Sequence, residues 1–281
     1  MTEPVRVHLR VPGTAPMPDL MRLIQSIEAA GFDGAGILDS QLLSRDTFVV
    51  LGQAAAQTSR MALFPAVTNP FTRHASVLAG AIQTVEEMAP GRVKFVIGTG
   101  YTSASTIGRA PGTLAEMRAC IQAVRELLAG KTVDFGSQRG RLGYAAGRRI
   151  PVLMAASGPK AIEVAGEVAD GVLLLVGANK GIVETALGHL ERGARRAGRK
   201  VEDLEIIWAV RTATMKTTDE ASCVSPPRRV MPTNSSDRSA SSCTRPSMES
   251  VRPQRLSRAQ SSVAPWRSRT ESSVDGPPVR P

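Results

Sequence analysis

Cysteine is scarce in this sequence, and its spacing excludes two kinds of site. The three cysteines, Cys120, Cys223 and Cys243, are too far apart for a disulfide framework or a zinc-ligand pattern. The sequence also lacks a run of about 18 apolar residues, which a transmembrane helix needs, and the charged and apolar segments of a signal peptide. It therefore predicts a cytoplasmic protein with no metal site and no membrane contact.

Lysine, isoleucine and phenylalanine are missing from the last 61 residues, 221–281. This segment has ten Arg and four acidic residues, so it supplies +6 of the formal net charge of +10. It has 15 Ser and nine Pro but one Leu, and no apolar periodicity. Its single aromatic residue, Trp266, offers no stacking platform for bases. We therefore expect a disordered tail, and the excess charge does not indicate a nucleic-acid partner.

The residues before this tail have a globular composition, so the predicted domains are 1–220 and 221–281. A helix is expected to begin at 218–221, but it runs into Pro226 and Pro227, and the pattern stops within an element. A shifted reading frame in GC-rich coding DNA is our hypothesis for this change. Translating the other two frames from the corresponding codon tests it, because one of them should restore a strand and an amphipathic helix.

Short β-branched or apolar segments alternate with amphipathic segments along residues 1–220. The apolar segments are mostly continuous, as in strands buried on both faces. The first amphipathic segment has Leu20, Leu23, Ile24 and Ile27 at helical spacing and stops at Gly31. The predicted strands are 5–11, 34–38, 61–68, 92–98, 150–155, 171–176 and 204–212; the other predicted helices are 46–58, 75–89, 114–128, 159–168 and 181–197, with Gly130 and Gly198 ending two of them.

Strands joined by single helices run parallel with right-handed crossovers, which leaves a doubly wound sheet or a closed (β/α)₈ barrel. The barrel is favoured because the first strands begin about 30 residues apart, and because no three-glycine phosphate turn follows the first strand. Residues 130–149 are expected to form an inserted loop or a small hairpin. Since no eighth strand is visible after 204–212, the predicted fold is an α/β (β/α)₈ TIM barrel that is truncated after strand 7.

In such a barrel the active site lies at the C-terminal ends of the strands. Asp39 follows a predicted strand, where its carboxylate would transfer a proton or hold a ligand, or else cap a turn. His74 begins a predicted helix beside Arg73 and can reach the barrel mouth, whereas His8 and His189 are expected to be structural. Asp39 and His74 are therefore the candidate catalytic residues, with water as the alternative.

Two glycine-containing turns are candidates for binding a ligand. The turn after the fifth predicted strand leads into a helix, so free backbone N–H groups, the helix dipole and a lysine would hold an anion or phosphate. An ordinary helix start is the alternative. Glycine after the fourth strand would let a flat ligand approach the backbone, or would simply make a turn. The residues concerned are Ser157, Gly158, Pro159 and Lys160 in the first turn, and Gly98 and Thr99 in the second.

Four stretches of the sequence carry a family resemblance. They resemble the luciferase-like superfamily of flavin- and deazaflavin-dependent oxidoreductases, which includes bacterial luciferase, and the second and fourth are most similar to the branch that uses coenzyme F-420 and is related to methylenetetrahydromethanopterin reductase. The stretches are AAGFDGAGILDS (29–40), FPAVTNPFTRHASVLA (64–79), GRVKFVIGTGYTSASTIGRAP (91–111) and IPVLMAASGPKAIEVAGEVADGVLL (150–174). The resemblance extends from about residue 4 to residue 221 and implies a (β/α)₈ barrel.

The resemblance also implies how a cofactor would bind. In this family a strand bulge with a non-prolyl cis peptide backs the ring system, and here it would fall at Ala66–Val67, next to Thr68 and Asn69. The turn at 157–160 would hold the cofactor phosphate. One departure lies in the third stretch, where related proteins often have an acidic residue after the glycines and this chain has Tyr101.

The resemblance favours an oxidoreductase that transfers a hydride between coenzyme F-420, a deazaflavin, and a small organic substrate. The alternative in the same fold is a monooxygenase that uses reduced FMN. A different class is a non-catalytic, truncated barrel that at most binds flavin. Because an open barrel would expose strand edges and apolar surface, association into a homodimer is also expected.

Overall fold

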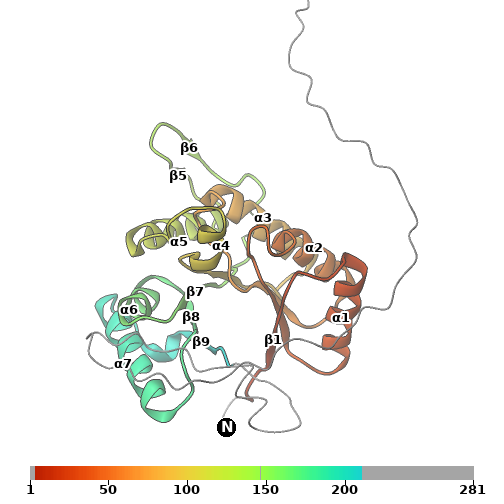
Figure 1. Ribbon diagram of the computed structural model, residues 1–281. Helices are drawn as coiled ribbons and strands as arrows, with labels where there is room; N and C mark the ends of the chain where they lie inside the picture. The colour runs from red at the N-terminus through yellow and green to blue at the C-terminus, as the bar shows by residue number, and fades with distance from the viewer. Residues whose placement is uncertain (1–3, 146, 211–281) are drawn as a thin grey trace, which may run out of the picture. The chain divides into compact units, whose positions relative to one another are not determined.

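The computed structural model describes residues 4–145 and 147–210, all of which belong to the first of two units of the chain, 1–226 and 227–281. Within these residues, parallel strands alternate with helices that lie outside them (Figure 1). The strands are β1 (His8–Val11), β2 (Gly34–Ile37), β3 (Ala62–Pro65), β4 (Phe95–Ile97), β7 (Val152–Ala156), β8 (Gly171–Leu174) and β9 (Glu205–Trp208). The helices are α1 (Met17–Ala29), α2 (Thr47–Gln57), α3 (Ala75–Met88), α4 (Tyr101–Thr106), α5 (Leu114–Leu128), α6 (Pro159–Val168), α7 (Lys180–Arg196) and the 3₁₀ turn η1 (Val201–Asp203).

The strands follow one another around the barrel in chain order. β1, β2 and β3 pair in parallel, and so do β4, β7, β8 and β9. Single parallel bridges, Leu63 with Val93 and Thr68 with Ile97, join β3 to the β4 segment. A doubly wound sheet would instead reverse its strand order at a switch point. The predicted parallel α/β barrel is therefore confirmed.

Capping side chains and glycines in the sequence determine where several helices begin and end. Asp46 caps α2 by accepting hydrogen bonds from the first-turn amides, and Thr113 forms a capping box with Glu116 at the start of α5. Gly130 and Gly198 follow α5 and α7 with φ of 71° and 66°, the left-handed region that glycine adopts at least cost. The predicted ends of these two helices are confirmed.

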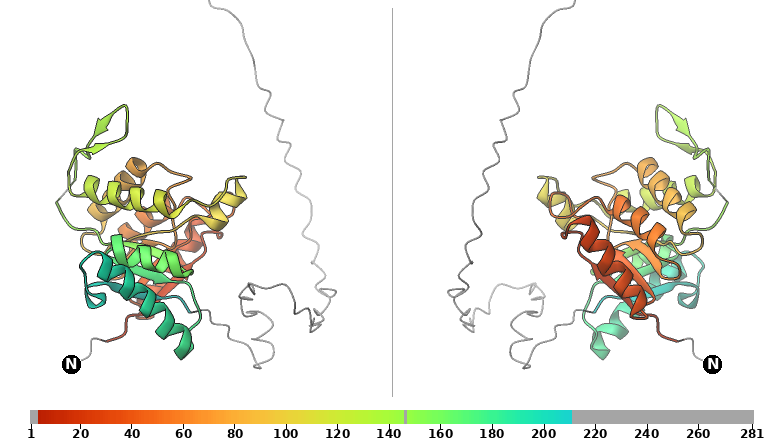
Figure 2. Two further views of the ribbon diagram at one scale, coloured as in Figure 1. Left: turned by 90° about the vertical axis from the view of Figure 1, so that its left-hand side faces the viewer. Right: turned by 90° about the vertical axis from the view of Figure 1, so that its right-hand side faces the viewer.

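Three details differ from or refine the predictions. On α1 the buried face includes Met21, while Leu23 is largely exposed, because the apolar stripe is rotated toward the side that packs on the strands. Helix α4 was not predicted, since its Ser/Thr-rich sequence follows two glycines and has no apolar period. Residues 130–149 form the predicted small hairpin, β5 (Val133–Asp134) with β6 (Arg139–Gly140), which projects beyond α3 and α5 (Figure 2).

Other predictions concern residues that lie outside the described part of the chain. They are the last two residues of the strand expected at 204–212, the helix expected at 218–221, and the tail at 221–281. The truncation after strand 7 and the domain boundary at residue 220 therefore stay predictions.

The central strands β2, β3, β4, β7 and β8 are buried on both faces, whereas β1 and β9 are partly exposed. Outward-facing side chains join the helices in a large apolar layer that includes Leu63, Ile97 and Met154. Inward-facing side chains fill the barrel lumen in a smaller layer, of which Phe64, Val96, Leu153 and Leu173 are the bulkiest members. This double burial explains why the strand sequences are continuously apolar.

Charged side chains occupy the N-terminal end of the lumen. Lys94, which precedes β4, pairs with Glu205 at the start of β9, so the ion pair crosses the lumen between strands that are not neighbours. His8 on β1 lies nearby with its ring edge-on to Phe64. Burial lowers the pKa of His8, and the charge of Lys94 lowers it further, so neutral imidazole is favoured in the fold.

The lumen ion pair leads to a stability prediction. The Lys94 side chain is 10% exposed and that of Glu205 27% exposed, so only the carboxylate retains appreciable access to water. Replacing Glu205→Leu leaves a buried ammonium without its partner and should lower the free energy of unfolding by about 3 kcal/mol in urea titrations. The double variant Lys94→Met, Glu205→Leu should recover most of that loss. A double variant as unstable as Glu205→Leu alone would contradict this account.

Candidate active site

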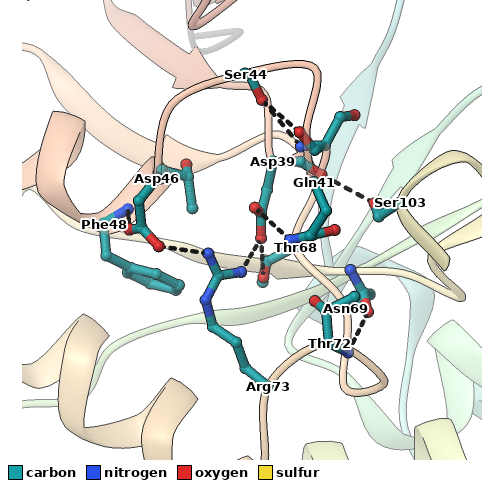
Figure 3. A network of polar contacts seen from close by, with 12 residues as sticks. Asp39, Gln41, Ser44, Asp46, Phe48, Thr68, Asn69, Thr72, Arg73 and Ser103 are labelled. Atoms are coloured by element: carbon teal, nitrogen blue, oxygen red, sulfur yellow. Dashed lines mark hydrogen bonds and ion pairs between the residues drawn. The ribbon is translucent and has the colours of Figure 1, made fainter. Parts of the chain in front are cut away.

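The C-terminal ends of β2 and β3 meet at a buried carboxylate, that of Asp39 (Figure 3). Asp39 lies two residues after the end of β2 and accepts three hydrogen bonds. Arg73 Nη1 donates to Oδ2 at 2.5 Å, the Thr68 hydroxyl donates to Oδ2 at 2.7 Å, and Gln41 Nε2 donates to Oδ1 at 3.1 Å. A carboxylate with both oxygens engaged in this way is suited to holding neighbouring groups in place.

Arg73 joins two acidic residues from different parts of the mouth. Its second nitrogen, Nη2, donates to Asp46 Oδ2 at 2.7 Å, and its guanidinium lies 5.3 Å from the centre of the Phe48 ring. Burial opposes ionisation of Asp46, but hydrogen bonds from Arg73 and from the Val49 amide outweigh it and lower the pKa of that carboxyl group. One guanidinium thus connects the loop after β3, the end of β2 and the start of α2.

Two side-chain amides beside Asp39 have a fixed polarity. Gln41 must turn its NH₂ toward the carboxylate, which leaves its Oε1 as an acceptor, and that buried atom has no partner among the described residues. Asn69 accepts from the amides of Phe71 and Thr72 through Oδ1, each at 3.0 Å, so its buried Nδ2 remains as an unpaired donor. Figure 3 shows both amides on the side of Asp39 opposite Arg73. They leave one donor and one acceptor at the mouth.

An apolar wall lies next to this polar group. The structure has a non-prolyl cis peptide bond at Ala66–Val67, the position that the resemblance indicates, and Arg10 Nη2 donates to the Ala66 carbonyl at 3.2 Å. Gly98 follows β4, and a Cβ atom there would lie 3.1 Å from Val67 Cγ1 and 3.4 Å from Ala155 Cβ. Glycine at this position avoids that crowding and would let a flat ligand approach the backbone closely.

The turn that follows β7 leads from this wall to the start of α6. Ser157 comes two residues after Ala155, and α6 begins at Pro159 with no side-chain cap on its first turn. Ser157, Pro159 and Lys160 are exposed. The first-turn amides of α6 and the lysine can therefore meet an anion, as the sequence predicts. The turn also borders a groove of about 370 Å³ between α6 and α7.

The other catalytic candidate, His74, lies apart from this constellation, and so does the thiol of Cys120, for which no site role is predicted. His74 caps α3, accepts from the Ser76 amide through Nδ1 at 3.3 Å, and lies 5.0 Å from the Phe135 ring. Cys120 is buried in α5, where burial raises the pKa of its thiol to about 12 and keeps it protonated. Among the residues in view, no cluster of His, Cys, Asp and Glu could hold a metal ion, and no helix is long and apolar enough to cross a membrane.

The structure brings most of the predicted site residues to one end of the barrel, and it adds others. Asp39, Thr68 and Asn69 lie together as expected, but Arg73, Gln41 and the Ser103 hydroxyl, which donates to the Asp39 carbonyl at 2.9 Å, were not predicted as site residues. A basic residue in the loop after β3 was the one available signal for Arg73. The roles assigned to Asp39, His74 and the binding residues stay predictions.

A family comparison agrees with this architecture. The family model described as luciferase-like monooxygenase matches residues 4–267. The chain belongs to this family. Curated family members that resemble it include the 5,10-methylenetetrahydromethanopterin reductase of Methanolobus tindarius, 32% identical over 64% of this chain and 56% of its own length. Another is an F-420-dependent glucose-6-phosphate dehydrogenase of Beutenbergia cavernae, 31% identical over 67% of this chain and 62% of its own.

Solved structures of the family show the same fold. The coenzyme F-420-dependent tetrahydromethanopterin reductase of Methanopyrus kandleri superposes with a TM-score of 0.68 at 26% identity, covering 77% of this chain and 69% of that one. A monooxygenase from Streptomyces bottropensis gives a TM-score of 0.64 at 20% identity, covering 78% and 75%. Both likenesses confirm the TIM-barrel architecture. The chain spans about 56–62% of the length of the two curated relatives named above.

The Arg73 network leads to a second stability prediction. The Arg73 side chain is 15% exposed and that of Asp39 3% exposed. Arg73→Ala would leave the buried carboxylate with two neutral donors, so the free energy of unfolding should fall by about 3–5 kcal/mol in urea titrations. Arg73→Lys keeps the charge but not the two-sided contact, and should lose less.

The matched control is Arg22→Ala on α1. Arg22 pairs with Asp19 in the open, with side chains 71% and 50% exposed, and such pairs contribute about 0–1 kcal/mol. Equal losses for Arg73→Ala and Arg22→Ala would show that the Asp39 network does not stabilise the mouth.

Proposed function

We propose that the protein is a coenzyme F-420-dependent oxidoreductase of the luciferase-like family that acts on a small organic substrate. The observation that carries the proposal is the continuity of the apolar wall at Val67, Gly98 and Ala155 with the anion turn at Ser157. A cofactor that placed a planar ring on the wall would therefore have its phosphate within reach of the turn. The printed names of the Beutenbergia cavernae relative and of the Methanopyrus kandleri structure include F-420, which favours the deazaflavin over FMN.

In this proposal each part of the mouth has a separate task. Ala66, Val67, Gly98 and Thr99 border the ring, and the turn of Ser157, Gly158, Pro159 and Lys160 binds the phosphate. Bound F-420 would supply a hydride to, or take one from, an electrophilic carbon such as a carbonyl or iminium carbon. Thr68 and Asp39 act by position: Asp39 anchors Thr68, Gln41 and Arg73, so that the rim of the pocket is rigid before a ligand binds.

The polar rim indicates how a substrate would be oriented. Asn69 Nδ2 and Gln41 Oε1 are a buried donor and acceptor without partners, and such groups are favoured only when a ligand or water pairs with them. A neutral group with both a donor and an acceptor fits them. A hydroxyl or an amide edge meets this description, whereas a lone carboxylate does not, because it would oppose the acceptor.

The test is binding to the purified 281-residue chain. Coenzyme F-420 should bind with a change in its own fluorescence, and reduced FMN should bind more weakly. Lys160→Glu should weaken F-420 about tenfold by opposing the phosphate, and should not change the affinity for the deazaflavin ribityl chromophore that lacks phosphate. Lys131→Glu, at an exposed site after α5, is the control and should bind as the wild type does.

If reduced FMN bound more tightly than F-420, the proposal of an F-420-dependent enzyme would be wrong and a reduced-FMN monooxygenase would replace it. Binding of neither cofactor would favour the non-catalytic reading. Turnover requires a substrate, and the donor at Asn69 and the acceptor at Gln41 suggest alcohols and cyclic amides as the first compounds to assay.

We propose further that the chain forms a homodimer and works in the cytoplasm. Exposed valines on neighbouring helices, Val49 on α2 and Val77 on α3, supply apolar surface for association. A cytoplasmic setting accords with Cys120, which is a free thiol. Light scattering after size exclusion should give the mass of two chains, and the double variant Val49→Asp, Val77→Asp should give the mass of one. A wild-type monomer would contradict the dimer.

A further inference from the structure

Strand β2 presents glycines instead of side chains to the barrel lumen. A Cβ atom on Gly34 would lie 2.4 Å from Nδ1 of His8. A Cβ atom on Gly36 would lie 2.6 Å from the Phe64 ring and 2.7 Å from Ala66 Cβ. The two glycines therefore leave space beside β2 that side chains of the neighbouring strands occupy. Side chains of β1 can consequently reach β3 across the face of β2.

Arg10 uses this space to connect β1 with β3. It lies two residues after His8 on β1, so both side chains are on the lumen face, and it pairs in register with Gly36. Arg10 Nη2 donates to the Ala66 carbonyl at 3.2 Å. Because β2 lies between β1 and β3, a side chain at position 36 would compete for the space that this contact crosses.

The carbonyl that Arg10 binds belongs to the apolar wall of the candidate site. It is the carbonyl of the peptide that joins Ala66 to Val67, and Val67 borders Gly98 on the same wall. Arg10 is exposed although it faces the lumen, so a molecule on the wall can approach its guanidinium. Since arginine is not deprotonated in proteins, this side of the wall has a permanent positive charge.

The other charged and titratable groups around the lumen and its C-terminal end contribute less net charge to the wall. They are Asp39 with Arg73 and Lys94 with Glu205 as ion pairs, the imidazoles of His8 and His74, the phenol of Tyr101 and the amine of Lys160. Each ion pair is neutral as a whole, and burial lowers the pKa of His8, which favours its uncharged form. β7 and β8 have no titratable residue, and Lys160 stands at the phosphate turn.

The charge of the ring differs between the two candidate cofactors. The oxidised ring of coenzyme F-420 has an acidic hydroxyl group, and ionisation of this group leaves a negative charge that is spread over the ring. The oxidised ring of FMN has no such group and is neutral near neutral pH. A guanidinium beside the ring attracts the anionic ring more strongly than the neutral one, and partial shielding from water strengthens the difference.

We propose that Arg10 makes the pocket selective for the anionic form of a deazaflavin ring. The inference rests on the proposed function, because it takes the ring to lie on the wall at Val67. It adds a residue of β1 that was not predicted as a site residue, and a charge-based reason for preferring F-420 to FMN. Binding of the anion lowers the pKa of the ring hydroxyl on the protein, so affinity increases as the pH rises from the bound pKa to the free one.

The test compares two ligands on the full 281-residue chain. One is oxidised coenzyme F-420, and the other is its ring methyl ether, in which the hydroxyl group cannot ionise. Arg10→Gln removes the charge and keeps a donor for the Ala66 carbonyl, whereas Arg10→Lys keeps the charge. Arg60→Gln is the matched control, because Arg60 is exposed and donates to the Phe32 carbonyl at 3.2 Å, before the start of β3.

Binding is measured by ligand fluorescence at a pH where the free hydroxyl is ionised, and thermal unfolding confirms that each variant is folded. We expect Arg10→Gln to bind F-420 about tenfold more weakly than the wild type does, and the methyl ether equally well. Arg10→Lys should retain more of the F-420 affinity, and Arg60→Gln all of it. In an absorbance titration of bound F-420, the pKa of the ring hydroxyl should lie below that of the free coenzyme, and Arg10→Gln should reverse this change.

Two results would overturn the inference and leave the proposed function intact, because F-420 would still bind. One is an equal loss of affinity for both ligands in Arg10→Gln, which would show that Arg10 only supports the wall. The other is a wild-type complex in which the ring hydroxyl keeps the pKa of the free coenzyme, a measurement that needs no variant to fold. A wild-type chain that binds neither ligand would overturn both proposals.

Discussion

The constraint on which this structure depends is that the central parallel strands, β2, β3, β4, β7 and β8, are buried on two sides. The outer side chains must fit the helices and the inner ones must fill a narrow lumen, so the strands tolerate few polar residues. Where charges do enter the lumen they are neutralised: Lys94 pairs with Glu205 across the barrel, and burial keeps His8 neutral. Polar chemistry is consequently displaced to the strand ends, where side chains meet both loops and water.

At the C-terminal end of the barrel, the Arg73 guanidinium holds together two loops that backbone hydrogen bonds do not align. The loop after β2 and the loop after β3 have no strand pairing to align them, yet Arg73 contacts Asp39 and Asp46 at once. Because Asp39 is engaged by Arg73, Thr68 and Gln41, its carboxylate is better placed to fix geometry than to exchange protons. These contacts favour a positioning role for Asp39 over the catalytic role that the sequence predicts, and they leave His74 and water as the candidate proton sources.

The sequence predicts what short-range rules govern and misses what depends on distant contacts. Continuous apolar strands, the glycines after α5 and α7, and the hairpin after α5 follow from local patterns, and the structure confirms them. Met21 rather than Leu23 lies on the buried face of α1, and which of the two is buried depends on how the helix is rotated against the strands. The contact of Arg73 with Asp39 joins residues 34 positions apart, and that of Arg10 with Ala66 joins residues 56 positions apart. No local pattern encodes such distances.

The distribution of charge relative to the apolar wall sets what a bound ring would experience. Lys94 and Glu205 lie at the opposite end of the lumen and Arg73 is turned toward two carboxylates, so the formal charge beside the wall is that of Arg10, which donates to the Ala66 carbonyl at 3.2 Å. A ring on this wall would be held by shape and dispersion, and it would also meet the field of this cation. Dispersion acts alike on the oxidised and reduced forms of a ring, so discrimination between the two forms depends on charged and polar atoms near the ring. The Arg10 guanidinium and the unpaired amides of Gln41 and Asn69 are the candidates for that role. Reactivity would thus be controlled from the rim of the barrel, while its core supplies a rigid surface.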